Sequence, residues 1–184
     1  MLQPTREERA MDLAATDRYR VVTWQDPAEL RLAAHELTGL ELLHRIAGRQ
    51  LPPPPVADLV GFEPAFVSPG FVVFAYEPRE EHYNALGAVH GGIVTTILDT
   101  AMSCAVHSEL EAGVTYATVE LKTSFVRPVT LATGPLRAEG RVIHQGSRIA
   151  TAEAKLLGAT GTLYATSSST SMILAAHREK RLAA

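Results

Sequence analysis

Apolar residues recur at steps of three and four positions between residues 27 and 48. This spacing places them on one stripe of an amphipathic helix. The residues of the stripe are Leu30, Ala33, Ala34, Leu37, Leu40, Leu43 and Ile46. Asp26-Pro27 supplies an N-cap and a first-turn proline, and the run LPPPP at 51–55 stops a helix because proline lacks a backbone donor. The pattern therefore predicts one helix over about 27–48, after an arm (1–25) without periodicity and before a short helical turn in VADLVGF.

From residue 63 onward the chain changes to runs rich in Val, Phe, Thr and Tyr, separated by turn residues. AFVSPGFVVFAYEP predicts two strands about Pro69-Gly70. LRAEGRVIH and RIATAEAKLL predict a hairpin about the Gln145-Gly146-Ser147 turn, and GTLYATSSSTSMIL predicts a last strand.

YATVELKTSF, residues 116–125, alternates with a period of two, which is typical of a half-buried strand. One face is expected to hold Ala117, Val119, Leu121, Thr123 and Phe125. The opposite face is expected to hold Tyr116, Thr118, Glu120, Lys122 and Ser124. Tyr76, Tyr83 and Phe125 are expected to fill the core; the alternative is that they line a pocket for an acyl group.

A second helix is predicted from Gly91 or Gly92 to about Ser108. Its apolar residues cover most of its circumference, the pattern of a helix packed against a sheet; they are Ile93, Val94, Ile97, Leu98, Ala101, Met102, Ala105 and Val106. Strands on both sides of this helix predict an α+β fold with an antiparallel sheet and the helix on one face. The expected organisation is an arm and helical extension (1–60), one α+β domain (61–176) and a tail (177–184).

Asp99 stands in the middle of this apolar helix, on a narrow polar stripe with Thr95 and Ser103. An ionised carboxylate in such a setting costs several kcal/mol unless it is paired or hydrogen-bonded, and the helix has no Lys or Arg. Asp99 must therefore have a partner elsewhere, a raised pKa or a chemical task. The alternative is an acid satisfied by a neighbouring strand or subunit, because structural networks also hold buried acids.

The loop GAVHGG before the helix adds a second candidate group. Its small residues allow a ligand to approach the backbone, and the first-turn N–H groups of a helix are unpaired and can polarise a carbonyl oxygen. Gly91 and Asp99 are eight residues apart, about 12 Å along a helix, too far for both to act on one carbonyl carbon. If both are catalytic, a site must combine the helix start of one copy with the aspartate of another. This predicts at least a homodimer.

Composition narrows the classes of function. A net charge of −3 and the absence of a dense basic run disfavour nucleic-acid binding. The N-terminus lacks an apolar signal region and no segment approaches a membrane span, so a cytoplasmic protein without a membrane partner is expected. Cys104 is the only cysteine, which excludes an internal disulfide, and it is interpreted as helix packing together with Met102. No metal site is expected, since the histidines lack ligand spacing; His82, His107 and His177 are interpreted as surface or helix-end residues.

The string HGGIVTTILDTAMSCA resembles the H-G-G…D signature of the phenylacetate-degradation (PaaI-like) branch of the hotdog-fold acyl-CoA thioesterases. The resemblance extends from GLELLHRI at 39 through HYNALGAVHGG, SFVRPV and QGSRIATAEAKL to residue 174. It implies a dimer with a continuous sheet, commonly paired into a tetramer, that hydrolyses acyl-CoA at the subunit interface. Asp99 matches the catalytic acid, as nucleophile or general base, and the Gly91 N–H matches the thioester-polarising donor. Further matched site residues are Asn84, His90 and Thr118.

A thioester carbonyl is electrophilic, so a carboxylate and an oxyanion donor suffice without a metal or organic cofactor. Arg127 and Arg148, with His144 nearby, are candidate clamps for the phosphates of coenzyme A; the alternative is that they are surface residues. Two other functions stay open: a hotdog module that binds acyl-CoA without hydrolysis, and an enoyl-CoA hydratase or dehydratase that uses Asp99 with His90.

Overall fold

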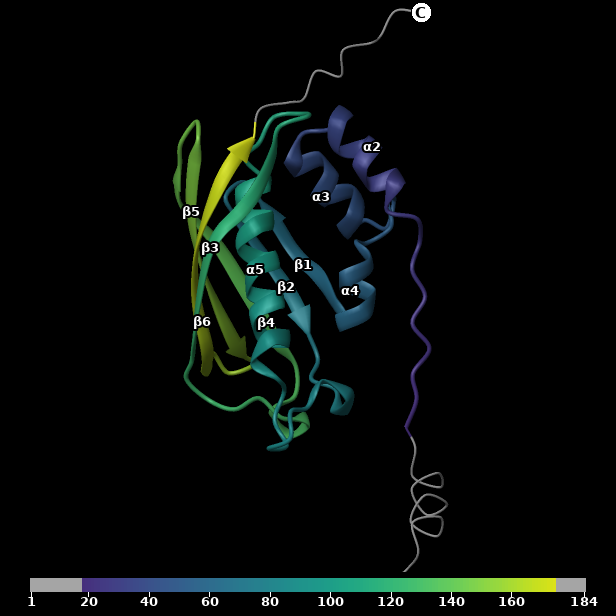
Figure 1. The fold of residues 1–184 in the computed structure, drawn as a ribbon, viewed down its shortest axis with the longest axis vertical. Helices are drawn as coiled ribbons and strands as arrows, with labels where there is room; N and C mark the ends of the chain where they lie inside the picture. Colours follow the sequence, from purple (N-terminus) through teal and green to yellow (C-terminus); the bar gives the residue numbers. More distant parts are fainter. Residues whose placement is uncertain (1–17, 175–184) are drawn as a thin grey trace, which may run out of the picture.

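The computed structural model describes residues 18–174, so His177 and the expected tail lie outside it. Within these residues three helices precede the sheet: α2 (Ala28–Glu36), α3 (Gly39–Ala47) and α4 (Pro55–Val60). The strands are β1 (Phe62–Ser68), β2 (Phe71–Tyr76), β3 (Thr115–Phe125), β4 (Leu136–Gln145), β5 (Ile149–Gly158) and β6 (Leu163–Leu174), with short 3₁₀ turns at Glu80–His82 (η1) and Leu131–Thr133 (η2). The long helix α5 (Gly91–His107) lies against one face of the sheet, and α2, α3 and α4 lie on the β1 side (Figure 1).

The single helix predicted over 27–48 is wrong. Leu37 has extended backbone angles, and Thr38 begins a new helix with a reciprocal capping box. The Thr38 hydroxyl accepts a hydrogen bond from the Glu41 N–H at 3.3 Å, and the Glu41 carboxylate accepts one from the Thr38 N–H at 2.9 Å. The capping box starts a new helix at Thr38 although the apolar stripe continues across this position. It does so because its two hydrogen bonds satisfy backbone donors that a helix start otherwise leaves unpaired.

The sheet is antiparallel throughout, with the strand order β1-β2-β4-β5-β6-β3. The predicted β1–β2 and β4–β5 hairpins and the last strand are confirmed, as is the helical turn in VADLVGF, which is α4. β1 and β3 are the outer strands, and β3 is hydrogen-bonded within the described chain to β6 alone. The predicted α+β architecture is therefore confirmed.

Helix α5 packs against all six strands. Its Ile97, Leu98 and Met102 are fully buried. The helix approaches β4 so closely that a Cβ added to Gly140 would lie 2.2 Å from the carbonyl oxygen of Ala101. A glycine is required at this crossing, since any side chain would push α5 away from the sheet.

Strand β3 departs from the predicted alternation. A bulge lies between Thr118 and Glu120, where one extra residue is inserted. Thr118 and Phe125 are an odd number of positions apart, yet both face α5: Thr118 contacts Asp99 and the Phe125 ring lies against Gly91. The prediction that Thr118 and Phe125 lie on opposite faces is therefore wrong, and the side chain of Val119, at the bulge, is 53% exposed.

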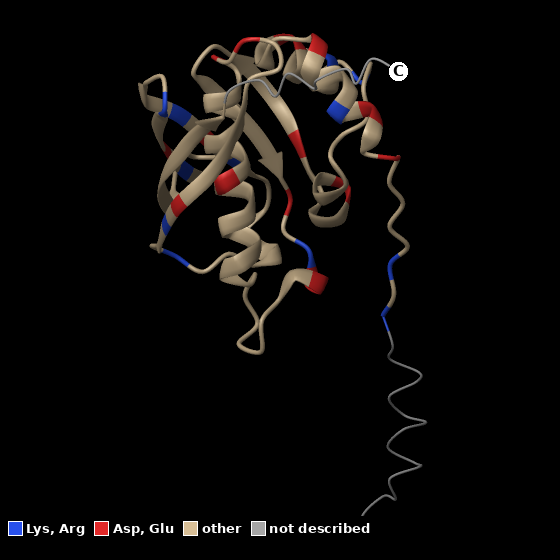
Figure 2. Ribbon diagram, turned by 45° about the horizontal axis from the view of Figure 1, so that its top comes forward, with Lys and Arg blue, Asp and Glu red and all other residues tan. Residues whose placement is uncertain are grey.

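Charged residues are distributed over the fold. Figure 2 shows Lys and Arg (blue) on strands, helices, loops and the N-terminal segment.

Of the helices between residues 18 and 174, none has the length and hydropathy that a bilayer span needs.

Candidate active site

Asp99 lies in the middle of α5 and faces β3. Its Oδ1 accepts hydrogen bonds from the Thr118 hydroxyl at 3.2 Å and from the Ser103 hydroxyl at 3.4 Å, and the two hydroxyls are 3.3 Å apart. Ser103 comes from the next turn of the same helix, and Thr118 comes from the outer strand. The helical spacing and the bulged strand thus place two hydroxyls on one carboxylate oxygen.

The environment of Asp99 favours its protonated form. Burial raises the pKa of the carboxyl group, and the hydrogen bonds from Thr118 and Ser103 oppose that rise in part. Within residues 18–174 no cation forms an ion pair with Asp99, and Oδ2 accepts no hydrogen bond. The neighbouring strand therefore satisfies one oxygen and leaves the other available. A carboxylate of raised pKa with a free oxygen is suited to general-base or nucleophilic work.

The start of α5 has one free donor. The Nδ1 of His90, the N-cap residue, accepts a hydrogen bond from the Gly92 N–H at 2.9 Å. The His90 carbonyl accepts from Ile93 and Val94. The Gly91 N–H donates to no atom of the described chain. His90 thus shapes the helix start and leaves the Gly91 N–H at its tip for an oxygen outside the chain.

Phe125 covers this helix start. A Cβ on Gly91 would lie 2.9 Å from the Phe125 ring, so the glycine makes room for the aromatic side chain. Phe125 is 57% exposed, and the expectation that it fills the core is wrong. Tyr76 is buried as expected, while the partly buried Tyr83 accepts a hydrogen bond from the Leu131 N–H through its hydroxyl.

Asn84 shapes the loop before α5. Its Oδ1 accepts hydrogen bonds from the N–H groups of Leu86 at 2.8 Å and Ala88 at 3.4 Å, which closes a turn around Gly87. Its side-chain amide NH₂ donates to no described residue. The structure thus gives Asn84 a turn-forming contact near the helix start and leaves its amide donors available.

The three candidate coenzyme A clamps lie at opposite ends of the sheet. Arg127 follows β3 and donates to the Leu163 carbonyl at 2.6 Å, at the β5–β6 turn and on the side of Gly91. Arg148 is in the β4–β5 turn, and His144 lies just before that turn. Strand β5 separates the two ends and has 10 residues, about 30 Å. One chain therefore does not bring Arg127 to Arg148.

Two residues near the site have contacts that the sequence pattern did not reveal. Ser103 was placed on the polar stripe, but its contact with Thr118 needed the register of β3. His82 ends the 3₁₀ turn η1, in agreement with its interpretation as a helix-end residue, but it does not lie on the surface: it is 7% exposed, and its Nδ1 lies 2.9 Å from the buried Tyr76 hydroxyl. The His82 carbonyl accepts from the His90 N–H at 2.8 Å and so supports the cap of α5. The alternation in β2, which buries Tyr76, was the available signal for this pair.

No group of three His, Cys, Asp or Glu side chains among the described residues could hold a metal ion.

Comparison with known proteins defines the class. The model of the thioesterase superfamily matches residues 86–165, which include Gly91, Asp99 and Thr118. Human acyl-coenzyme A thioesterase 13 is 30% identical over 99 residues, which are 53% of this chain and 69% of that protein. A phenylacetic acid degradation-related protein from Ralstonia eutropha is 29% identical with a TM-score of 0.65 and covers 71% of this chain and 98% of its own. The PaaI protein from the phenylacetic acid degradation operon of E. coli has a TM-score of 0.65 at 20% identity, over 76% of this chain and 97% of its own.

The sheet and helix therefore form a hotdog-like thioesterase fold. The chain belongs to the thioesterase superfamily. A Halobacterium salinarum relative is 40% identical over 80 residues, and this match spans about half (51%) of that relative's length.

Proposed function

We propose that this protein is an acyl-CoA thioesterase that hydrolyses a fatty or aryl acyl-CoA to the free acid and coenzyme A. The observation that supports this most is that one helix carries both an N–H at Gly91 to which no described residue offers an acceptor and a carboxylate, Asp99, whose pKa is raised and whose Oδ2 accepts no hydrogen bond from residues 18–174. The superfamily membership supports the same chemistry.

The N–H of Gly91 donates a hydrogen bond to the thioester oxygen and stabilises the negative charge that develops on it as the carbonyl carbon becomes tetrahedral. Asp99 either removes a proton from the attacking water or attacks the carbon itself to give an anhydride that water then opens. In both routes a C–O bond forms, the C–S bond breaks, and the thiolate leaves and takes up a proton. Thr118 and Ser103 hold Oδ1, so Oδ2 is the oxygen that reacts.

Strand β3 offers the edge on which a composite site forms. It has 11 residues and one side that pairs with no strand of residues 18–174, and long free edges of this kind pair with a second strand. Antiparallel pairing of two β3 strands about their middle sets the Phe125 end of one copy beside the Thr118 end of the other. Phe125 lies beside Gly91, and Thr118 contacts Asp99. This pairing therefore brings the Gly91 N–H of one copy toward the Asp99 carboxylate of the second. The same pairing turns Arg127 toward the end of the second copy that carries Arg148 and His144.

The first test is thiol release, followed with a disulfide reagent, on short, medium, long and aryl acyl-CoAs. We expect release by the wild type from at least one class. Tight binding of acyl-CoA without release would instead support the non-hydrolytic binding module. Hydration of an enoyl-CoA without thiol release would support the hydratase function.

A matched pair of variants tests the donor. Gly91→Pro removes the N–H at the first helical position, where proline is tolerated, and Gly91→Ala adds a similar Cβ but keeps the N–H. We expect Gly91→Pro to lose at least about tenfold more turnover than Gly91→Ala. Equal losses would contradict the role of this donor.

Mixed dimers test the composite site. Refolding equal amounts of Gly91→Pro and Asp99→Asn yields mixed dimers, each of which keeps one intact site. When pairing is random, the whole sample then holds about a quarter of the intact sites of the wild type. Recovery of about that activity supports a site shared between two copies. No recovery in dimers shown to be mixed would contradict it.

A further inference from the structure

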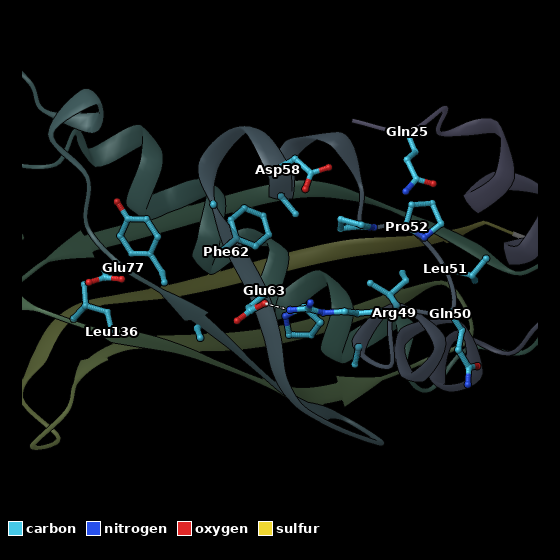
Figure 3. Close-up of a pocket in the computed structure, with 18 of the residues that line it drawn as sticks. Gln25, Arg49, Gln50, Leu51, Pro52, Asp58, Phe62, Glu63, Glu77 and Leu136 are labelled. Carbon is cyan, nitrogen blue, oxygen red and sulfur yellow. Dashed lines mark ion pairs between the residues drawn. The ribbon is translucent and has the colours of Figure 1, made fainter. Parts of the chain in front are cut away.

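A pocket of about 850 Å³ lies between the N-terminal extension and the strands, away from the candidate active site. Figure 3 shows Phe62 of β1 and Leu136 of β4 among its lining, with Leu51 and Pro52 from the loop between α3 and α4. Neither Gly91 nor Asp99 lines this pocket. Its volume is that of a small-molecule site.

The inner wall is apolar and already packed. Ala57, Phe62 and Leu136 expose 5% or less of their surface, and Pro52 is also buried. Phe62 is held edge-on by Phe74 at 5.6 Å between ring centroids. A rigid wall of this kind can receive the apolar body of a ligand without reordering.

Arg79 is the one lining cation that the described chain leaves unpaired. Its guanidinium lies flat against Gly61, where an added Cβ would meet the Cζ atom at 2.4 Å. Gly61 ends α4 in the left-handed region (φ 78°), a conformation that favours glycine and leaves the space that Arg79 occupies. Arg79 is half-buried, and its side chain forms no ion pair or hydrogen bond with residues 18–174.

The other charged residues that line the pocket determine which kind of anion it can bind. Arg49 is paired with Glu63 at 3.6 Å, and these side chains are 87% and 70% exposed. Glu29 and Glu77 are exposed lining residues, and Asp58 is half-buried. With four acids against two arginines, a polyphosphate would be repelled, whereas one carboxylate needs only the free guanidinium.

We propose that this pocket is a second ligand site that binds an organic monocarboxylate, with its carboxylate on Arg79 and its apolar body against Phe62, Pro52 and Leu136. The proposal stands independently of thioester hydrolysis, because no residue of the candidate active site takes part.

Calorimetric titration with octanoate, and with octanamide as its uncharged counterpart, tests the site. The variants are Arg79→Gln, Arg49→Gln as a matched arginine of the same pocket, and Asp99→Asn. We expect Arg79→Gln to weaken octanoate binding at least about tenfold, as loss of a charge-assisted pair requires, while octanamide binding stays within about twofold. Arg49→Gln and Asp99→Asn should leave octanoate affinity within about threefold of the wild type.

Failure of the wild type to bind octanoate saturably would overturn the proposal. So would equal octanoate affinities in the wild type and Arg79→Gln, or a parallel loss of octanamide binding, which would indicate structural damage. Loss of octanoate binding in Asp99→Asn would assign the carboxylate to the candidate active site and also overturn it.

Discussion

Thr118→Val removes the hydroxyl that joins the outer strand to Asp99 and keeps the shape of the side chain. The lost contact is the 3.2 Å hydrogen bond to Oδ1, and Ser103 is then the remaining donor at 3.4 Å. Because the Thr118 bond lowers the pKa of Asp99 against the effect of burial, the pKa of Asp99 should rise further in the variant.

The magnitude follows from the geometry of this bond. A hydrogen bond to a charged group is worth about 1.5–3 kcal/mol, but the 3.2 Å length of this bond and its half-buried position reduce its value to about 1 kcal/mol. Because the bond already forms in the free enzyme, kcat/KM measured above the Asp99 pKa should fall by no more than about fivefold, which corresponds to the full energy of the bond. The acid limb of the pH–rate profile should also move to higher pH, since the base must be ionised.

Carboxyl-detected NMR titration of Asp99 measures the pKa directly, and thiol release measures the rate. Thr118→Ser serves as the control because it keeps the donor. An unchanged Asp99 pKa in Thr118→Val, or an equal shift in Thr118→Ser, would refute the reasoning about Oδ1.

The remaining predictions concern stability and reactivity. The pKa of Asp99 is raised from its ordinary 3.8, so its stabilising contribution is complete below pH 3.8 and is lost as pH rises through the folded pKa. Asp99→Asn should therefore be more stable than the wild type at pH 7 by urea unfolding, and the difference should vanish near pH 3; equal stability at pH 7 would contradict this sign. Gly140→Ala should cost about 3 kcal/mol, because its Cβ would lie 2.2 Å from the Ala101 carbonyl oxygen, and a loss below about 1 kcal/mol would show that α5 moves freely. Burial raises the pKa of the Cys104 thiol to about 12, so a disulfide reagent should label it far more slowly in the native protein than in urea; equal labelling rates would contradict its packing role.

The strands and α5 were predictable because long periodic segments carry their own signal. Apolar residues around α5 indicated that a sheet covers it. Asp99 was identified as a candidate site residue because it is a carboxylate within this apolar helix. The break at Thr38 was missed because the stripe continues through it, although the Thr38 and Glu41 spacing of a capping box was present.

The contacts of the site depend on register, which the sequence pattern does not determine. Strict alternation separates Thr118 from Phe125, and only the bulge at Val119 places both beside α5. The burial of His82 depends on Tyr76 from another strand, and the separation of Arg127 from Arg148 depends on strand order. These are long-range pairings, so local periodicity could not reveal them.

The most direct test of the central claim compares the wild type with Asp99→Asn on the best acyl-CoA substrate, with substrate binding and oligomeric state measured on the same samples. The account predicts that Asp99→Asn binds the acyl-CoA with similar affinity, keeps its oligomeric state and loses most thiol release. Release at the wild-type rate by a folded Asp99→Asn protein would show that Asp99 is not the catalytic acid.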